Sequence, residues 1–194
     1  ADVEINSRNI TAETIEKKLT KKTVAIIAVH YAGLMCKMDE IKKLALKKNI
    51  LLIEDSAECL GGTYKKKYSG SFGIGCFSFF PSKNITTTEG GMLTTNSKKN
   101  FEYVKKLIAH GIDKNLKKKP WHRIASLPGH NFRMPNHLAA LGISQLNRLK
   151  KFNKRREIIA KKYKIFFLKY PKIFEVQKVM SDFYHSYQMY SIII

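Results

Sequence analysis

The sequence predicts an α/β fold in which a mainly parallel, mixed β-sheet lies between helices. Two continuous apolar runs, VAIIAVH at 24–30 and ILLIED at 50–55, are typical of strands that are covered on both faces. The amphipathic segment MDEIKKLALKKN at 38–49 lies between them. A strand, a helix and a second strand joined by short links form a right-handed βαβ unit, and such units build parallel sheets.

The helices of the N-terminal part are predicted from caps and stripes. A short helix is expected at 10–19, because Thr11 is a suitable N-cap and Ile10 and Ile15 stand at the two positions of a hydrophobic staple. In the segment 38–49 the apolar residues share one helical stripe, with lysines on the opposite face. The residues of this stripe are Met38, Ile41, Leu44 and Ala45.

The rest of the chain alternates between strands and helices. The predicted elements are, in chain order, a hairpin at 63–70, strands at 75–80 and 91–95, a helix near 98–109, a loop at 111–132 and a long helix at 136–170. The loop, which contains Pro120 and Pro128, is long for a compact domain, and such loops are usually functional or disordered. The long helix carries apolar residues at helical spacing, as in core or dimer packing. They are Leu138, Leu146, Leu149, Phe152, Ile159, Tyr163 and Phe166.

Both ends of the chain resemble cuts in a longer sequence. The chain opens without a methionine and ends on YHSYQMYSIII at 184–194, an apolar strand that we expect to be paired inside a sheet. We therefore expect a partial large domain at 1–150. A linking helix and the truncated start of a small C-terminal domain are expected at 151–194.

The charge of the chain suggests a nucleic-acid partner at first sight. The 194 residues carry a formal net charge of +21, with a pI of about 9.9. The excess is nearly all lysine and is scattered, whereas a nucleic-acid surface gathers its basic residues on one face. We therefore expect solvated helix faces and no nucleic-acid partner. A basic, non-catalytic nucleic-acid-binding protein remains the alternative from another class.

The cysteines and the hydropathy predict a cytoplasmic protein. Cys36, Cys59 and Cys76 form no CxxC pair, which argues for a reducing compartment. No apolar run approaches the ~20 residues of a membrane span, so no membrane partner is expected. No group of His, Cys and Asp residues has the spacing of metal ligands, and no serine or cysteine stands in a nucleophile elbow.

Asp55 and Lys83 follow predicted strands, where α/β folds collect their ligands. Asp55 ends one strand, and Lys83 comes directly behind a run that should be buried, namely Cys76, Phe77, Phe79 and Phe80. A carboxylate and an amine at neighbouring strand ends can form a structural salt bridge. They can also form a pyridoxal phosphate site, where the lysine binds the cofactor and the aspartate keeps the pyridine nitrogen protonated.

Essentially the whole chain resembles the DegT/DnrJ/EryC1/StrS family, the pyridoxal-phosphate sugar aminotransferases of fold type I. The stretches that carry the resemblance are VHYAGLMCKMDEI, IEDSAECLGGTYKKKYSGSFG, CFSFFPSKNITTTEGGMLTTN and GHNFRMPNHLAALGISQLNRLKKFNKRREIIAKKY. The resemblance implies the large domain of a fold-type I transferase, similar to aspartate aminotransferase, followed by the start of a small domain. The cofactor that it implies is pyridoxal 5′-phosphate.

The resemblance implies roles for residues that follow the two strands. Lys83 matches the lysine that binds the cofactor and moves a proton in the reaction, and Asp55 matches the partner of the pyridine nitrogen; both would be catalytic. Ala57 would pack against the ring face. Glu58 occupies the position that faces the ring hydroxyl.

Two further residues are implied to bind the phosphate. Ser78, five residues before Lys83, would point its hydroxyl toward the phosphate. Asn131 would reach the phosphate of the cofactor in the neighbouring subunit, so a homodimer is expected. His30 ends a strand nearby, and its first interpretation is structural.

The activity that the resemblance implies is amino transfer to a sugar. An amino acid, with glutamate the expected donor, would supply the amino group to a nucleotide-linked keto-deoxysugar in cell-surface polysaccharide or aminosugar biosynthesis. The stretches EDSAE and HYAGLMC look most like members that act at C4. The alternative within the fold is a pyridoxal-phosphate-dependent sugar dehydratase, which lacks the lysine. The presence of Lys83 argues against it.

The chain departs from the family pattern in several places. Thr88 stands where members commonly carry glycine, and the turn SFGIG is one residue short. The N-terminal segment that supplies a phosphate-binding turn and a stacking aromatic residue is missing, as is the end of the small domain. We therefore expect this chain alone to bind the cofactor weakly at most and not to transaminate.

Overall fold

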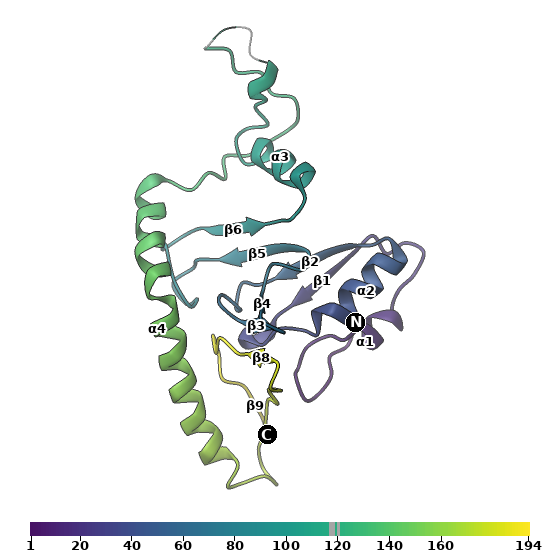
Figure 1. Cartoon of the computed structure of the whole chain (residues 1–194), viewed down its shortest axis with the longest axis vertical. Helices are drawn as coiled ribbons and strands as arrows, with labels where there is room; N and C mark the ends of the chain where they lie inside the picture. The colour runs from purple at the N-terminus through teal and green to yellow at the C-terminus, as the bar shows by residue number, and fades with distance from the viewer. Residues whose placement is uncertain (117–118, 120) are drawn as a thin grey trace.

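A four-stranded sheet forms the centre of the computed structural model, which describes residues 1–116, 119 and 121–194 (Figure 1). The strand order is β1-β2-β5-β6. The bounds are β1 Ala25–Val29, β2 Leu51–Asp55, β5 Ile74–Ser78 and β6 Gly91–Thr94. The first three strands are parallel, and β6 runs antiparallel to β5. The predicted mainly parallel, mixed sheet is confirmed.

Two helices cover one face of β1 and β2. Helix α1 (Ala12–Glu16) begins at Thr11, whose side chain forms a capping box with Thr14. Helix α2 (Met38–Lys48) turns its predicted apolar stripe inward and leaves its lysines exposed. Together with β1 and β2 these helices enclose the main core, which includes Ile15, Ile26, Ala28, Ile41, Leu44 and Leu52.

The other face of β1 is open, so the prediction of a strand covered on both faces is wrong for this chain. Ala28 is fully buried, whereas its neighbour Ile27 is 59% exposed. Side chains alternate between the faces of a strand, and α1 and α2 pack on the face that carries Ala28. Nothing in the described part of the chain covers Ile27 and Val29 on the other face.

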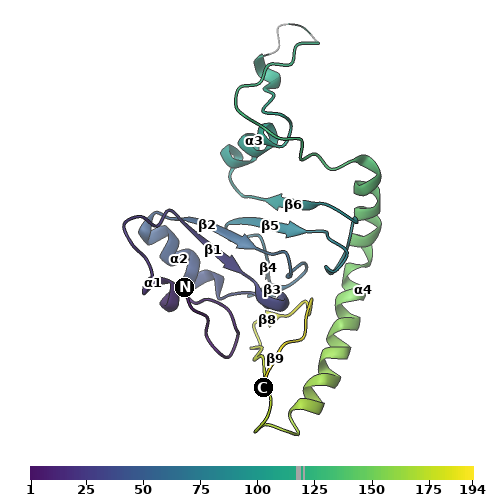
Figure 2. The ribbon, with the colours of Figure 1, turned by 180° about the vertical axis from the view of Figure 1, so that it is seen from behind.

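The C-terminal segment returns to the sheet-bearing half of the molecule (Figures 1 and 2). The predicted hairpin is β3 (Thr63–Tyr64) and β4 (Lys67–Tyr68), and β8 (Phe183–Tyr184) extends it in the order β4-β3-β8. A separate pair joins β7 (Glu175–Val176) and β9 (Ile192–Ile193).

The prediction of one strand over 184–194 is therefore wrong. Only its two ends are strands, because Tyr187 has a φ of +48° and breaks the extended backbone between them.

Helix α3 (Lys98–Leu107) leads into an excursion that projects beyond the sheet (Figure 1). The predicted loop contains the short 3-10 helix η2 (Lys114–Leu116) and two isolated bridges, Ala109 with Asn131 and Ile112 with Ala125. The structure thus gives this loop more order than the sequence suggests. Pro120 lies outside the described residues.

Helix α4 (Asn136–Phe167) runs along the side of the molecule and crosses residue 150 without a break (Figure 2). Several residues of its predicted apolar stripe are exposed in this chain, namely Leu146, Ile159, Tyr163 and Phe166. They do not belong to the core of the described chain. None of the helices in the described ranges is long and apolar enough to span a membrane.

Candidate active site at the strand ends

The sheet register brings Asp55 next to the strand that leads to Lys83. Asp55 is paired with Val29 on one side and with Cys76 on the other. Because side chains two residues apart on a strand share a face, Ser78 lies on the same face as Cys76. Asp55, Cys76 and Ser78 therefore project from the open face of the sheet, near the carboxyl ends of β2 and β5.

Asp55 is oriented by the backbone that follows it. Its Oδ1 atom accepts a hydrogen bond from the N–H of Ala57 at 3.1 Å, as in an Asx turn. Burial and the charge of Asp55 both raise the pKa of the Cys76 thiol. The carboxylate is thus held at the strand end with part of its surface open to a ligand.

The ion pair of Lys83 is with Glu58. The Nζ atom of Lys83 lies 3.9 Å from Oε1 of Glu58, and the side chains are 19% and 24% exposed. The other oxygen of Glu58 accepts a hydrogen bond from the N–H of Ala32 at 2.9 Å. A structural salt bridge between Asp55 and Lys83 was one interpretation of the sequence. In the structure, the ion-pair partner of Lys83 is Glu58. Both side chains of the pair are thus partly covered and partly open to solvent.

The loop that carries Lys83 is ordered by its own backbone. The N–H groups of Lys83 and Thr87 donate to the carbonyls of Phe80 and Phe79, each at 2.9 Å, and Phe79 N–H donates to Gly90 at 3.0 Å. Phe79 is buried, but Phe80 is 49% exposed because it lies past the end of β5. The prediction that Phe80 is buried is wrong.

Thr88 adopts a backbone conformation that suits glycine. Its φ is +67°, which is rare for a β-branched residue. The Thr88 N–H donates to Oγ1 of Thr86 at 2.8 Å and so helps to hold this turn. The turn therefore has a left-handed geometry at Thr88, the position where the family resemblance implies a glycine.

Ser78 and Asn131 have hydrogen bonds of their own. Oγ of Ser78 accepts from the N–H of Phe80 at 3.3 Å. Asn131 is exposed at the base of the excursion, and its Oδ1 atom accepts from Nε of Arg133 at 3.3 Å. In the described part of the chain, no hydrogen bond or ion pair joins Asn131 to Asp55, Glu58 or Lys83. The structure groups the other predicted site residues at the strand ends and leaves Asn131 apart.

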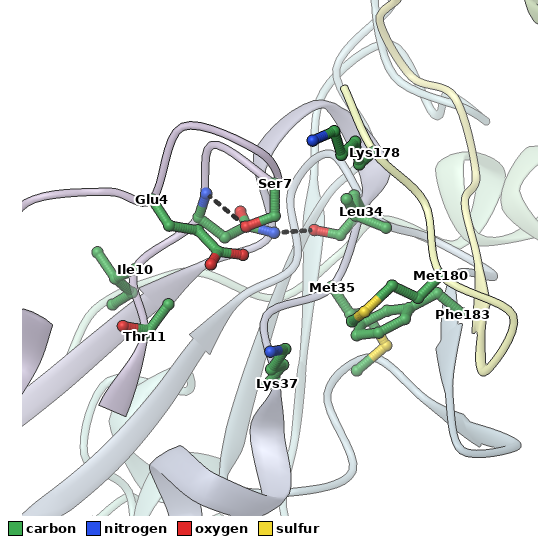
Figure 3. A pocket seen from close by; sticks show the side chains of 11 residues that line it. Glu4, Ser7, Ile10, Thr11, Leu34, Met35, Lys37, Lys178, Met180 and Phe183 are labelled. Carbon is green, nitrogen blue, oxygen red and sulfur yellow. Dashed lines mark hydrogen bonds between the residues drawn. The ribbon is translucent and has the colours of Figure 1, made fainter. Parts of the chain in front are cut away.

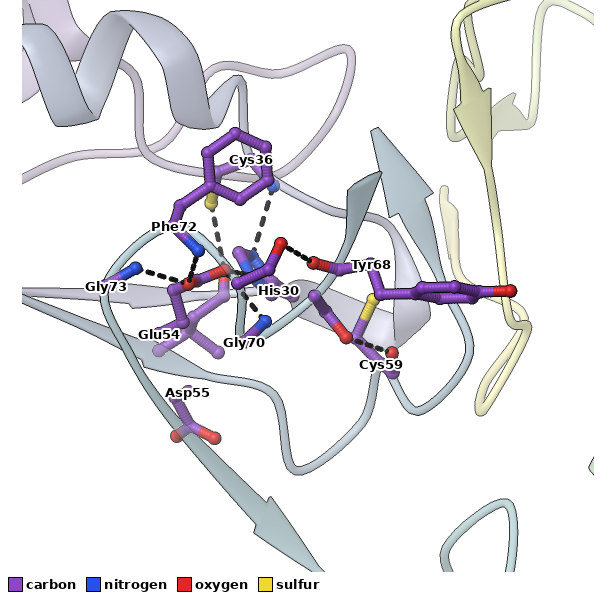
Figure 4. Close-up of polar contacts among 12 residues, drawn as sticks. His30, Cys36, Glu54, Asp55, Cys59, Tyr68, Gly70, Phe72 and Gly73 are labelled. Atoms are coloured by element: carbon purple, nitrogen blue, oxygen red, sulfur yellow. Dashed lines mark hydrogen bonds and ion pairs between the residues drawn. The ribbon is translucent and has the colours of Figure 1, made fainter. Parts of the chain in front are cut away.

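Glu54 and His30 form a buried polar cluster behind Asp55 (Figure 4). Both side chains are fully buried, and Nε2 of His30 lies 3.2 Å from Oε2 of Glu54. Cys36 N–H donates to Nδ1 of His30, so Nδ1 is the acceptor and Nε2 carries the proton that points at Glu54. The glutamate also accepts backbone hydrogen bonds from Gly70, Phe72 and Gly73. His30 is structural, in agreement with its first interpretation.

The charge of Glu54 is stabilised despite its burial. Burial raises the pKa of this carboxyl, but the hydrogen bonds from His30 and the backbone outweigh burial and bring the pKa below its usual value. Glu54 was not singled out from the sequence. An acidic residue inside an otherwise apolar strand is the signal that could have found it.

A separate small cavity lies between the N-terminal loop and the C-terminal segment (Figure 3). Its volume is about 20 Å³, enough for a single water molecule but not for a substrate. Asn9 closes it by donating to the carbonyl of Leu34 at 2.9 Å. Among the described residues, no group of His, Cys, Asp or Glu side chains is placed to hold a metal ion.

Comparisons with known proteins agree with this geometry. A sequence model of the DegT/DnrJ/EryC1/StrS aminotransferase family matches residues 1–194. A GDP-perosamine synthase of Escherichia coli O157:H7 is 40% identical over 185 residues, which cover 95% of this chain and 49% of that protein.

Solved structures give the same result. Helicobacter pylori PseC, an aminotransferase involved in the biosynthesis of pseudoaminic acid, matches with a TM-score of 0.90 and 33% identity, over 98% of this chain and 51% of that one. The E. coli GDP-4-keto-6-deoxy-D-mannose-3-dehydratase with bound hydrated PLP matches with a TM-score of 0.86 and 32% identity. This match covers 100% of this chain and 52% of that one. These neighbours confirm the predicted fold-type I class.

The chain spans about half the length of the relatives that it matches. The family match nevertheless extends from the first residue to the last. The chain therefore belongs to the DegT/DnrJ/EryC1/StrS aminotransferase family.

Proposed function

We propose that this chain is part of a pyridoxal-phosphate-dependent aminotransferase that acts on a nucleotide-linked keto-sugar. One observation carries the proposal: the Lys83 amine and the Asp55 carboxylate follow adjacent parallel strands, β5 and β2, and Lys83 is paired with Glu58 there. The family to which the chain belongs is one of aminotransferases.

The residues at the strand ends fit pyridoxal phosphate by their chemistry. Lys83 offers the primary amine that an aldehyde binds, and it lies in a partly covered place. Asp55 is an oriented carboxylate that can hold a proton on a pyridine nitrogen. When bound, the cofactor supplies an electron sink for the substrate's carbon–nitrogen chemistry. The open face beside Asp55, with Ile27 and Val29 exposed, offers apolar surface near the site.

Each neighbouring residue has a proposed part in that site. Ala57 is small enough to lie beside a flat ring, and its N–H already orients Asp55. Ser78 can donate its hydroxyl hydrogen to a phosphate, since its oxygen is the acceptor in the hydrogen bond from the N–H of Phe80 at 3.3 Å. Glu58 can hold the Lys83 amine in place until a ligand arrives. Lys83 itself is the group that takes up and returns the proton in the transfer step.

A homodimer would complete the site. Asn131 is exposed and apart from the other site residues of its own chain, as a residue that serves a partner's phosphate would be. The exposed apolar side chains of α4, such as Tyr163 and Phe166, offer surface for further contacts. We also propose the division into a partial large domain at 1–150 and the start of a small domain at 151–194.

The proposed substrates are a nucleotide-linked keto-deoxysugar and an amino-acid donor. The name of GDP-perosamine synthase supports the nucleotide-sugar class, and PseC supports aminotransferase activity. Reaction at C4, glutamate as donor, and a place in polysaccharide or aminosugar biosynthesis complete the proposal. A cytoplasmic location is supported by the three cysteines, all of which are free thiols.

Isotope transfer tests this function. The whole protein, meaning the chain together with the half that its relatives have beyond it, is incubated with amino-¹⁵N glutamate and a panel of nucleotide-linked 4-keto-6-deoxysugars. Mass spectrometry should find ¹⁵N in the sugar product. Failure of every sugar in the panel to acquire the label would contradict the proposal.

A dehydratase is the second candidate, because the E. coli 3-dehydratase is among the structural neighbours. In the same assay a dehydratase would release a deoxygenated ketosugar that contains no ¹⁵N. The presence of Lys83 opposes this candidate, since the dehydratases of the fold work without that lysine.

A further inference from the structure

The segment His185–Met189, between β8 and β9, lies against the loops that follow β1 and β2 (Figures 1 and 2). The N–H and hydroxyl of Ser186 donate to the carbonyl of Gly33 at 3.0 and 3.3 Å, and the hydroxyl also reaches the carbonyl of Glu58 at 3.2 Å. Met189 N–H donates to the carbonyl of Ala32 at 3.2 Å. The segment is thus joined to the loops after β1 and β2, two of the three loops at the candidate site; the third is the loop of Lys83 after β5.

The same segment also holds the loop of Lys83 on both sides of the lysine. Nε2 of Gln188 donates to the carbonyl of Ser82 at 2.9 Å. Nδ2 of Asn84 donates to the carbonyl of Ser186 at 3.0 Å and to Oδ1 of Asn153, on α4, at 2.8 Å. Asn84, Ser186 and Asn153 are all buried. Residues 82 and 84 are therefore both fixed from outside their own loop.

The segment is itself well anchored, so it can act as a support. Nη1 of Arg156, on α4, donates to the carbonyls of Tyr187 and Gln188 at 3.2 and 3.0 Å. The rings of His185 and Tyr187 stack with their centroids 3.9 Å apart. Burial lowers the pKa of His185 to about 3, so the ring is neutral and its Nδ1 accepts from the N–H of Tyr187.

Gly33 allows the close approach of this segment. A Cβ atom at Gly33 would stand 2.5 Å from Oγ of Ser186 and 2.9 Å from the backbone nitrogen of Tyr187. Its φ of +103° also favours glycine. The fit between the loop after β1 and the segment is therefore close and specific.

We propose that the segment His185–Met189 positions Lys83 relative to Glu58, with Gln188 and Asn84 as the positioning residues. The Lys83–Glu58 separation of 3.9 Å joins two loops that the segment contacts independently. Without the hydrogen bonds with this segment, the Lys83 loop would keep its internal contacts, the hydrogen bond from Asn84 to Asn153 and the Lys83–Glu58 pair. The chemical role of Lys83 rests on the proposed function. The way in which the segment holds Lys83 does not.

The test compares Gln188→Met and Asn84→Ala with the wild type and with the control Met189→Ala. Gln188→Met keeps length and volume but removes the donor, and its half-buried position tolerates the change. The Met189 side chain is exposed and its backbone contact is unaffected by the substitution. The whole protein is used without added cofactor. Hydrogen exchange is measured on residues 79–90, and acetylation of Lys83 is measured against the exposed Lys47 of α2.

Loss of one such hydrogen bond should make opening of the Lys83 loop about fivefold more frequent. We expect amide exchange in 79–90 to rise by about that factor in Gln188→Met and by more in Asn84→Ala, which loses two hydrogen bonds, while β1 and β2 exchange as in the wild type. Acetylation of Lys83 should rise relative to Lys47, because the amine is mostly covered in the structure. Met189→Ala should change neither readout.

Unchanged exchange and acetylation in Gln188→Met and Asn84→Ala, with β1 and β2 intact, would overturn the proposal. A fall in thermal stability without a change at Lys83 would assign the segment a purely structural role, and would overturn it equally. Neither readout needs the cofactor. The inference can therefore fail while the aminotransferase function stands, and the reverse is also possible.

Discussion

At the scale of single residues, Glu54 is the most heavily hydrogen-bonded side chain near the site. Glu54→Ala would leave the Nε2–H of His30 and three backbone N–H groups without their acceptor. Breaking a buried charged network of this kind costs about 3–5 kcal/mol. We expect the free energy of unfolding to fall by roughly that amount in urea titrations. Glu40→Ala, at an exposed position of α2, is the control and should change it by less than about 0.5 kcal/mol.

The same residue makes stability depend on pH. The pKa of Glu54 is lower in the folded protein than its ordinary value of 4.5. The ionised Glu54 therefore makes its full contribution to the free energy of unfolding above pH 4.5. This contribution is lost as the pH falls through the folded-state pKa. In Glu54→Gln the free energy of unfolding should therefore fall less steeply as the pH is lowered from neutral into the acid range. An unchanged slope would contradict an ionised, buried Glu54.

Substitution of Thr88 by glycine should stabilise the protein, in contrast to Glu54→Ala. Thr88→Gly relieves a left-handed backbone that costs a β-branched residue about 1–2 kcal/mol, and glycine's extra entropy in the unfolded chain offsets part of this. We expect a net stabilisation of about 0.5–1 kcal/mol in thermal or urea unfolding. Thr86→Gly, which removes the acceptor for Thr88 N–H, should instead destabilise the protein. Destabilisation by Thr88→Gly would show that the threonine is not strained.

Sequence reasoning located the ionisable residues of the site better than their partners. Asp55 and Lys83 were predictable because strand ends of parallel sheets collect polar groups. The Glu58–Lys83 pair and the contacts of Ser186 were not, since they depend on how separate loops approach one another in space. Phe80 was placed wrongly, because the apolar run continues past the last strand residue, Ser78.

At the scale of elements, helices α1 and α2 follow their sequence patterns closely. Helix α2 was predictable from its apolar stripe, and the N-cap of α1 was predictable as Thr11, whereas its pairing with Thr14 was not predicted. The central part of the C-terminal segment was not, because polar His185 and Ser186 are buried there by contacts with distant loops. An apolar and aromatic sequence predicts a strand only when nothing else organises its backbone.

The open face of β1 leads to a prediction for that element. Ile27 is exposed in this chain, although the run 24–30 has the composition of a strand covered on both faces. If the remaining half of the protein packs there, Ile27→Asn should destabilise the whole protein by about 2–5 kcal/mol, as other polar or truncating core substitutions do. Lys47→Asn, on exposed α2, is the control. Equal, small effects of both substitutions in urea unfolding would show that the face stays open.

At the scale of the whole molecule, the chain spans about half the length of the relatives that it matches, and we expect the proposed site to be divided between this chain and the rest of the protein. The family resemblance places a phosphate-binding turn in a segment that the 194 residues do not include. Two lost charge-assisted contacts, worth about 3 kcal/mol together, weaken binding roughly 100-fold. We expect the chain alone to bind pyridoxal phosphate at least that much more weakly than the whole protein in absorbance titrations. Equal affinities would contradict a divided site.

The central claim is that Lys83 is the cofactor lysine, and borohydride trapping tests it most directly. The whole protein is mixed with pyridoxal phosphate, reduced, digested and analysed by mass spectrometry, alongside Lys83→Arg and Asp55→Ala. We predict a stoichiometric adduct on the peptide that contains Lys83, its loss in Lys83→Arg, and its retention in Asp55→Ala together with poor amino transfer. A stoichiometric adduct on another lysine, undiminished in Lys83→Arg, would contradict the account.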